Sequence, residues 1–491
     1  MSETADLRTP APSVTAPQLA WARAMLARPA ALLIVLSMLF GSAMILLNPP
    51  LRGPDEPAHF LRVYAYANGV ILPTTEVDGR KGIDLPARLH DDYAFFRART
   101  ESIWTPGFSF STAMNEHRIL RAVRPAQEDA RDPVFVPFEG SESYTLAAYA
   151  PYVAAALVAR VLDLEFVTSL TLQRFAGLAA FTAVAAYAVA VTPHLKWAFF
   201  LIAMLPASLY GRAVVGADGA AIGFALVVVA LALRAITSPS RDPAWHPIWQ
   251  RALWMTLCVL AKPPQVAFIL LEPMIHRWRD WRTQWRTILL VTAPGVVLTL
   301  LWIWAMDAEM AAWRVYADEG RSPEHFSLGW KLSFMLQEPL HFPRAMFATL
   351  FGEAFGLWRQ LIGVLGWLDT HLHLGVYILL SVLFLPTVFE RLSFDAATRH
   401  RVAACAALVI AGYVTAVFLI LFITWTPPEE PLVWGVQGRY FTGLLPLAGV
   451  IVAALANVSL PPRLIAGAAL LGAVISGTAC IEGLWRVNWA G

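Results

Sequence analysis

The sequence predicts an all-α polytopic membrane protein with about eleven transmembrane helices. Of its 491 residues, 57% are hydrophobic and only 15% are charged. The mean hydropathy of +0.56 is far above that of an average soluble domain. Apolar segments long enough to cross a bilayer recur from one end of the chain to the other. Together these observations exclude an ordinary soluble globular fold.

The N-terminal 28 residues differ in composition from the rest of the chain. They are rich in Pro, Ala, Ser and Thr and lack the small-residue cleavage site of a signal peptide. We expect residues 1–28 to form a disordered cytoplasmic tail and segment 29–47 to remain as a membrane anchor. Arg23 and Arg28 precede that segment and place the N-terminus in the cytoplasm. Residues 29–491 then form the transmembrane domain.

The apolar segments are identified by their length, because a helix needs about 20 residues to cross the hydrocarbon core. The long candidates are 29–47, 170–191, 197–213, 218–236, 286–306, 373–390, 402–424, 438–456 and 463–483. Shorter apolar stretches cover 145–162, 249–261 and 264–276. The role of each short stretch depends on the orientation of the longer segments.

Basic residues between the segments set that orientation. Arginines cluster within 234–251, 277–286 and 391–401, and short basic loops belong in the cytoplasm. If 145–162 crossed the membrane, the first of these loops would lie outside. We therefore interpret this stretch as an interfacial or re-entrant helix.

The stretches 249–261 and 264–276 have basic residues at both outer flanks and Lys262-Pro263-Pro264 between them. Each is too short for a comfortable crossing, so we expect a thin helical hairpin with Lys262 at its outward tip. On this count two long loops, about 48–169 and 307–372, are extracytoplasmic, and the first contains interfacial helices. The chemistry of the protein is expected on that side.

Composition also excludes several classes of function. Its 37 basic and 35 acidic residues give a net charge of +2, without the basic footprint of a nucleic-acid-binding protein. The three cysteines lie inside apolar segments, so no disulfide framework is expected. The sequence has no Gly-rich phosphate loop, serine elbow or zinc helix. A cytoplasmic nucleotide-sugar enzyme would therefore have no donor site here.

The most informative motif follows the first apolar segment and contains the adjacent carboxylates Asp55 and Glu56. Ionisable residues at the edge of a bilayer are costly and are enriched in functional roles. A structural interpretation is equally open, because Asp55 stands where it could cap a helix about three turns long. On such a helix Asp55, His59 and Arg62 share one face. The carboxylate could accept a proton or bind a divalent cation, while His59 or Arg62 counters a phosphate.

Other charged positions stand near the predicted outer ends of the segments. Lys262 either snorkels to the interface or holds a phosphate as a point charge. Arg439 and Tyr440 begin an apolar segment, where they are either interfacial anchors or part of a phosphate site. Arg212 and Asp218 lie between two segments, where they either form an ion pair that closes a turn or belong to the site.

Several short motifs of the chain resemble those of a known group of proteins. They are PDEPAHF at 54–60, YAPY at 149–152, KPP at 262–264, GWLDT at 366–370 and QGRYF at 437–441. An acidic pair after the first span and a large outer loop resemble the GT-C class of membrane glycosyltransferases. The motifs are more closely similar to a bacterial family of multi-spanning membrane proteins named only as a domain of unknown function and grouped with GT-C. The likeness extends over about residues 29–456.

The resemblance implies a GT-C-like fold and the transfer of a sugar from a polyprenyl-phosphate or polyprenyl-pyrophosphate carrier to an acceptor hydroxyl. Direct displacement would invert the anomeric centre. Asp55 is then the catalytic carboxylate, with Glu56 in support. Asp218 matches an acidic residue that, as part of an acidic pair, helps to hold a metal in several GT-C enzymes. The second carboxylate of that pair has no counterpart in this sequence. The candidate ligands for Mg²⁺ or Mn²⁺ are therefore Asp55, Glu56 and Asp218.

The same resemblance implies the partners and the location. The expected substrate-binding residues are His59, Arg62, Arg212, Asp218, Lys262, Arg439 and Tyr440, with Lys262 and Arg439 at the carrier phosphate. We expect a polyprenyl-linked sugar donor, a glycan or lipid-linked acceptor and contact with membrane lipids. The protein would be a multi-pass protein of the bacterial inner (cytoplasmic) membrane that acts in cell-surface glycan assembly, with its site facing the periplasm or cell exterior. A lipid-linked glycan flippase and a non-catalytic scaffold of polysaccharide assembly remain as alternatives.

Overall fold

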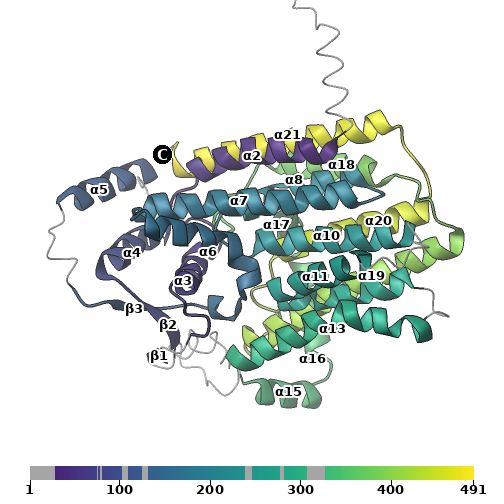
Figure 1. Cartoon of the computed structure of the whole chain (residues 1–491), viewed down its shortest axis with the longest axis horizontal. Coiled ribbons are helices and arrows are strands. Elements are labelled where there is room, and N and C mark those ends of the chain that lie inside the picture. Colours follow the sequence, from purple (N-terminus) through teal and green to yellow (C-terminus); the bar gives the residue numbers. More distant parts are fainter. Residues whose placement is uncertain are drawn as a thin grey trace, which may run out of the picture.

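The computed structural model describes residues 28–73, 76–77, 80–101, 109–123, 131–237, 246–276, 281–306 and 327–490. Within these ranges the protein is mostly helical and has one short antiparallel sheet. The long helices lie side by side in a bundle, which Figure 1 shows with the helices running across the view. Apart from Arg28, the predicted cytoplasmic tail lies outside the described residues.

Seven helical segments in the described ranges are long and apolar enough to cross a membrane. They are α2 (Pro29–Leu47), α7 (Phe166–Val191), α10 (Asp218–Thr237), α13 (Trp281–Met306), α19 (Ala396–Thr424), η7 with α20 (Gly438–Leu444, Leu445–Ala456) and α21 (Pro462–Asn488). The shorter apolar helices are α6 (Leu146–Val161), α11 (His246–Ala261) and α18 (Leu374–Val388). The chain is thus a polytopic helical membrane protein, and the number of eleven crossings stays a prediction.

The predicted single span at 197–213 is wrong in one respect, because the structure divides it into two helices. α8 (Lys196–Met204) ends before Leu205, whose ψ of 147° is extended, and α9 (Pro206–Ala213) begins at the next residue. A proline disfavours helical backbone at the residue before it, which explains the break. Nearly all residues of both helices are buried.

The predicted hairpin at 249–276 turns at Lys262, but its two halves differ. α11 ends at Ala261, and Lys262 is extended (φ −148°, ψ 126°). The returning half is a 3₁₀ helix, η4 (Pro263–Leu271), followed by the single turn α12 (Glu272–Ile275). The stretch interpreted as interfacial is α6, whose preceding Thr145 donates a 2.8 Å hydrogen bond to the carbonyl of Leu260. The first residues of α6 therefore lie beside the turn at Lys262.

The first long loop folds into a compact group of short elements. Its helices are α3 (Glu56–Ala67), α4 (Ala87–Glu101), α5 (Phe110–Val123) and η3 (Ser141–Ser143). The strands β1 (Glu76–Val77), β2 (Arg80–Leu85) and β3 (Val134–Pro137) pair antiparallel in the order β1-β2-β3. The sequence-based prediction did not include this sheet. Figure 1 shows the group gathered at one end of the bundle.

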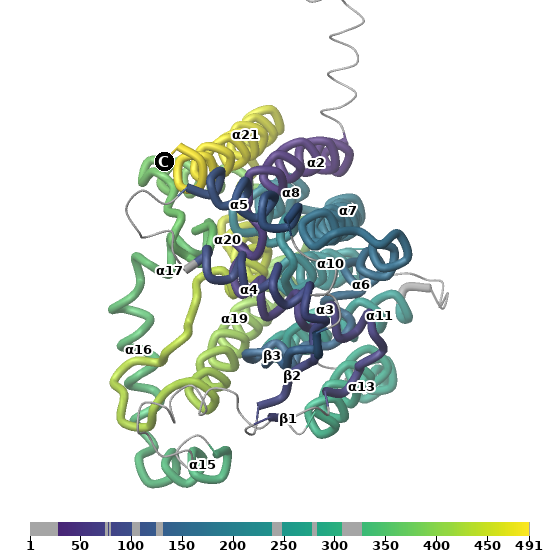
Figure 2. The backbone as a smooth tube through the Cα atoms, turned by 90° about the vertical axis from the view of Figure 1, so that its left-hand side faces the viewer, coloured from purple at the N-terminus to yellow at the C-terminus, as the bar shows by residue number. Residues whose placement is uncertain are grey.

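The C-terminus lies at that end of the bundle as well (Figure 1). α2 and α21 lie next to each other (Figures 1 and 2), and the indole of Trp489 donates a 2.7 Å hydrogen bond to the carbonyl of Leu47. Arg486 on α21 donates to the carbonyl of His371, at 2.8 Å. The helices of the second loop are α15 (Leu328–Gln337), α16 (His341–Gly352) and α17 (Ala354–Ile362). The first residues of α2 lie at the opposite end (Figure 1).

Candidate functional site

Four charged residues that the sequence analysis singled out form one continuous cluster at the end of the bundle where the first long loop lies. Arg439 Nη2 lies 2.8 Å from Asp55 Oδ2, and Arg439 Nε lies 3.4 Å from Asp218 Oδ2. Lys262 Nζ forms an ion pair with the other oxygen of Asp218, Oδ1. We call Asp55, Asp218, Lys262 and Arg439 the ion-pair cluster. Its members come from the turn before α3, the start of α10, the α11–η4 junction and η7.

Exposure separates Asp55 from the other three residues of the ion-pair cluster. The side chains of Arg439, Lys262 and Asp218 are only 9%, 10% and 19% exposed, whereas that of Asp55 is 61% exposed. Of the two carboxylate oxygens of Asp55, only Oδ2 has a side-chain partner among the described residues. The cluster therefore presents one accessible carboxylate oxygen, Oδ1, in front of buried positive charges.

The helix-cap interpretation of Asp55 is wrong. Asp55 occupies the residue before α3, but its side chain makes no capping hydrogen bond and turns to Arg439 instead. Its backbone is left-handed (φ 55°, ψ 15°), whereas capping residues are typically extended. This conformation costs roughly 1–2 kcal/mol in residues other than glycine, although Asp and Asn tolerate it best. Such strain persists where the surroundings impose it, often at functional sites.

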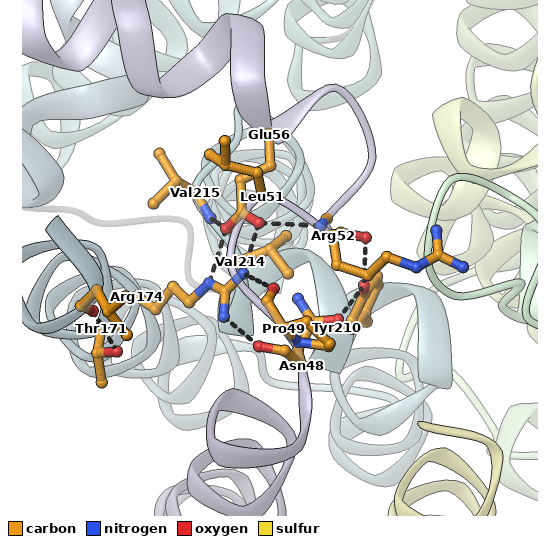
Figure 3. A network of polar contacts seen from close by, with 12 residues as sticks. Asn48, Pro49, Leu51, Arg52, Glu56, Thr171, Arg174, Tyr210, Val214 and Val215 are labelled. Carbon is orange, nitrogen blue, oxygen red and sulfur yellow. Dashed lines mark hydrogen bonds and ion pairs between the residues drawn. The ribbon is translucent and has the colours of Figure 1, made fainter. Parts of the chain in front are cut away.

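Glu56 lies next to Asp55 in sequence but points away from the ion-pair cluster. Its carboxylate is fully buried and accepts four hydrogen bonds, as Figure 3 shows. Nε and Nη2 of Arg174 donate to Oε1 and Oε2 at 2.8 and 2.6 Å. The backbone N–H groups of Val215 and Gly53 each donate at 2.9 Å. Every lone-pair direction of this carboxylate is in use.

The pair of Glu56 and Arg174 fixes the turn that carries Asp55. Arg174 also donates to the carbonyls of Asn48 and Pro49, at 2.6 and 2.8 Å (Figure 3). The whole segment from the end of α2 to the start of α3 is therefore tied to α7. The sequence analysis did not single out Arg174. The signal was present, because an arginine inside an apolar span needs a buried partner.

Arg62 and Arg212, both predicted to bind substrate, lie outside the ion-pair cluster. Arg62 is fully buried and donates to the hydroxyl of Tyr66 and the carbonyl of Ile71, both at 2.8 Å. Arg212 donates to Ser37 Oγ at 3.1 Å and to the carbonyl of Ala203 at 2.8 Å. The ion pair suggested for Arg212 with Asp218 does not form, because Asp218 pairs with Lys262 and Arg439.

His59 and Tyr440 lie beside the ion-pair cluster. His59 Nδ1 is 2.6 Å from the hydroxyl of Tyr149, and its ring packs edge-on against Tyr144. Burial lowers the pKa of His59 to about 4; Asp55 and Asp218 oppose this shift, whereas Lys262 and Arg439 add to it, so this ring is neutral at neutral pH. It therefore offers no positive charge to a phosphate. Tyr440 places its ring centroid 4.5 Å from Lys262 Nζ, a cation–π contact.

Arg439 retains unused hydrogen-bonding capacity. Its Nη1 and Nε atoms are buried and have no hydrogen-bond partner in the described part of the chain, although Nε faces Asp218 at 3.4 Å. A buried donor without an acceptor costs about 1–3 kcal/mol or more when it belongs to a charged group. An anionic oxygen beside Nη1 would remove that cost. A phosphate fits this requirement, because guanidinium groups bind it with good geometry.

The three candidate metal ligands do not fit a divalent cation. The carboxylate of Glu56 is saturated by Arg174 and backbone N–H groups, and it does not face Asp55 or Asp218. The other two carboxylates are paired with Arg439 and Lys262. No group of three His, Cys, Asp or Glu side chains suited to a metal occurs among the described residues. Cationic side chains hold the positions that a metal would need.

Fold and site together define a polytopic helical membrane protein with a charged cluster at one end of its bundle. Residues 38–448 match a family model described as "Predicted membrane protein (DUF2142)", which covers most of the chain. The protein belongs to this family, as its motifs indicated. No curated protein and no solved structure matches the chain.

Proposed function

We propose that this protein is a glycosyltransferase that moves a sugar from a polyprenyl-phosphate carrier to an acceptor hydroxyl at the extracytoplasmic face of the bacterial inner membrane. The observation that carries the proposal is the pairing of an exposed carboxylate, Asp55, with a buried arginine, Arg439, whose Nη1 has no acceptor among the described residues. Asp55 can act as the base and Arg439 can bind an anion, and the two side chains are hydrogen-bonded to each other. This arrangement suits the transfer of a sugar from a phosphate carrier.

In the proposed reaction the acceptor oxygen attacks the anomeric carbon of the donor. The new C–O bond forms as the bond between the anomeric carbon and the phosphate oxygen breaks, and that electron pair remains on the phosphate. Asp55 Oδ1 takes the proton of the acceptor hydroxyl, a role that contributes roughly 10²- to 10⁴-fold. Arg439 and Lys262 stabilise the charge that develops on the leaving phosphate. The product has an inverted anomeric centre.

Asp218 acts as a positioning residue in this scheme. It holds Lys262 and Arg439 at one place, although the two come from the α11–η4 junction and from η7. Without it, two buried cations would face each other with less compensation. Glu56 and Arg174 contribute indirectly, because they fix the backbone that carries Asp55.

The extracytoplasmic location of this reaction rests on the distribution of charge. Arginines at 234, 251, 286, 391, 399 and 401 flank the apolar helices away from the ion-pair cluster, and the positive-inside rule assigns such residues to the cytoplasm. Polyprenyl-linked sugars are suited to this setting, because an acyl chain in the bilayer and a phosphate at its surface match an apolar bundle with a charged end.

The proposal is tested with purified protein, a polyprenyl-phosphate-linked sugar and a lipid-linked acceptor. We expect Asp55→Asn to lower the transfer rate by about 10²-fold or more, because Asn keeps the shape and tolerates the backbone but cannot accept the proton. Asp163→Asn is the matched control, since Asp163 is also exposed and left-handed (φ 49°) and is not part of the ion-pair cluster. The control should retain full activity.

The same experiment distinguishes a transferase from both alternatives. A flippase moves a lipid-linked glycan without chemistry, so it would yield no transfer product with any variant. A scaffold of a polysaccharide assembly complex would also yield none. If transfer occurs and Asp55→Asn equals Asp163→Asn in rate, the catalytic assignment of Asp55 is wrong. Product analysis by NMR checks the inverted anomeric configuration.

A further inference from the structure

A large cleft lies between the second long loop and the segment that links α19 to α20. Its volume is about 540 Å³, within the range of sites for small ligands. α16 and α17 form one wall, and residues 432–436 form the other. In Figure 2 the linking segment runs past α16 toward α17. The N–H of Val433 donates to Thr349 Oγ1 at 2.8 Å and holds the two walls together.

The cleft combines aromatic rings with unpaired polar groups. Trp425 and Trp434 line it and are half-buried. The carboxylate of Glu353 lines it as well and has no ion-pair or hydrogen-bond partner among the described residues. Gln360 uses its side-chain oxygen to accept from Gly438 N at 2.8 Å, and its amide donors bond to none of the described residues.

The walls of the cleft pack against two segments that carry residues of the ion-pair cluster or its neighbours. On one side, α17 packs directly on the turn that carries Arg439, since a Cβ added to Gly438 would lie 1.9 Å from the carbonyl oxygen of Leu357. On the other side, the ring of Trp425 lies 3.7 Å from the position of a Cβ on Gly140. The adjacent Ser141 donates a 2.7 Å hydrogen bond to the carbonyl of Ala58, on the same helix as His59. The wall formed by α17 and the ring of Trp425 are therefore held in fixed positions relative to the turn of Arg439 and the helix of His59.

The lining distinguishes between classes of ligand. A phosphate is disfavoured, because Glu353 is negative and no basic side chain lines the cleft in the described ranges. An isoprenoid chain is disfavoured as well, since it would desolvate that carboxylate and the amide of Gln360 without giving them partners. A sugar ring satisfies both requirements. Its C–H face packs on indole rings, and its hydroxyl groups donate to a carboxylate and accept from an amide.

We propose that this cleft is the binding site for a saccharide chain of the acceptor. The inference deepens the proposed function. The assignment of the bound saccharide as the acceptor rests on that function, whereas saccharide binding itself does not depend on transfer. Trp425 and Trp434 provide stacking surfaces, and Glu353 and Gln360 bind hydroxyl groups. The hydroxyl that receives the sugar then lies at the end of the cleft nearest Asp55.

The test is direct binding to an immobilised array of bacterial surface glycans, without any sugar donor. The full-length protein is purified in a detergent that has no sugar headgroup, so that the detergent does not compete. We expect the wild-type protein to bind neutral oligosaccharides, and Trp434→Ala to weaken that binding roughly tenfold through loss of one stacking surface. Glu353→Gln should weaken it as well. Trp304→Ala, at an 80% exposed indole on α13, should leave binding unchanged.

Three results would overturn the inference. The first is an absence of glycan binding by the wild-type protein, and the second is equal binding by the wild type, Trp434→Ala and Glu353→Gln. The third is binding of polyprenyl phosphate by the wild type that is lost in Trp434→Ala and Glu353→Gln. That result would assign the cleft to the carrier. Glycan binding without any transfer would support the cleft and count against the proposed function. Transfer with an unchanged acceptor KM in both variants would do the reverse.

Discussion

At the scale of single residues, the adjacent carboxylates Asp55 and Glu56 have opposite environments. Asp55 is 61% exposed and strained, and it has one carboxylate oxygen without a partner among the described residues. Glu56 is fully buried and accepts from Arg174, Val215 and Gly53. A residue optimised for stability is expected to resemble Glu56, and one kept for chemistry is expected to resemble Asp55.

The two carboxylates should therefore respond differently to loss of charge. We expect Glu56→Gln to destabilise the protein by about 3–5 kcal/mol, because it leaves the buried guanidinium of Arg174 without its counter-ion. Asp55→Asn should cost less than about 1 kcal/mol, because Asp55 itself is 61% exposed, the Asn oxygen can still accept from Arg439, and Arg439 keeps Asp218 as a counter-ion. Thermal unfolding of both purified variants, followed by tryptophan fluorescence, measures the difference. Equal melting temperatures would contradict the division of roles.

His59 should make stability depend on pH. Its pKa is lowered by burial to about 4 in the folded protein, from an ordinary value of 6.5. Below pH 6.5 the unfolded chain binds a proton that the folded protein does not bind, so stability falls as the pH drops toward 4. The His59→Gln variant lacks this group. The stability difference between wild type and variant should be constant above pH 7 and should shift against the wild type below pH 6.5. A difference that does not change with pH would show that this ring is not held neutral.

At the scale of elements, apolar length predicted where most helices lie but not how each one is built. The break between α8 and α9 follows from Pro206, which was visible in the sequence. The sheet was not predictable in the same way, because β2 pairs with β3 across about 50 residues and its register, such as Gly82 with Pro137, depends on that distant contact. Asp55, Asp218, Lys262 and Arg439 were each identified from charge at the ends of apolar segments. The partners of their neighbours were not predictable in this way: the pairing of Arg174 with Glu56 and the contacts of Tyr144 and Tyr149 with His59 became visible only through packing.

The contact between η7 and α17 gives a prediction at this scale. A methyl group at Gly438 would overlap the carbonyl oxygen of Leu357, so one of the two elements must move and take Arg439 with it. We expect Gly438→Ala to destabilise by about 1–3 kcal/mol, as overpacking usually does. Gly375→Ala in α18 is the control, since nothing lies within 4 Å of the added atom. A melting temperature of Gly438→Ala equal to that of the control would contradict the close packing.

At the scale of the whole molecule, the ion-pair cluster joins four parts of the chain that lie as many as 384 residues apart. Such contacts require the bundle to be assembled, and no local pattern in the sequence specifies them. The two carboxylates are balanced by two cationic side chains, Lys262 and Arg439, so the assembled site is electrically neutral before any ligand binds. A sugar donor with one negative charge on its phosphate would then bind to a neutral site in which Arg439 still has a buried N–H group with no acceptor among the described residues.

This balance predicts how transfer responds to metal ions. We expect the wild-type activity to be the same in EDTA and in Mg²⁺ or Mn²⁺, because Arg439 and Lys262 neutralise Asp55 and Asp218 without a metal. Arg439→Ala removes one of these cations and leaves two carboxylates near a single lysine. A divalent cation should bind that variant more tightly than the wild type, since hard cations bind carboxylate oxygens, and isothermal titration calorimetry with Mn²⁺ measures this without any assay of transfer. Activity that EDTA abolishes and Mn²⁺ restores in the wild type would show that a metal, and not Arg439, stabilises the leaving phosphate.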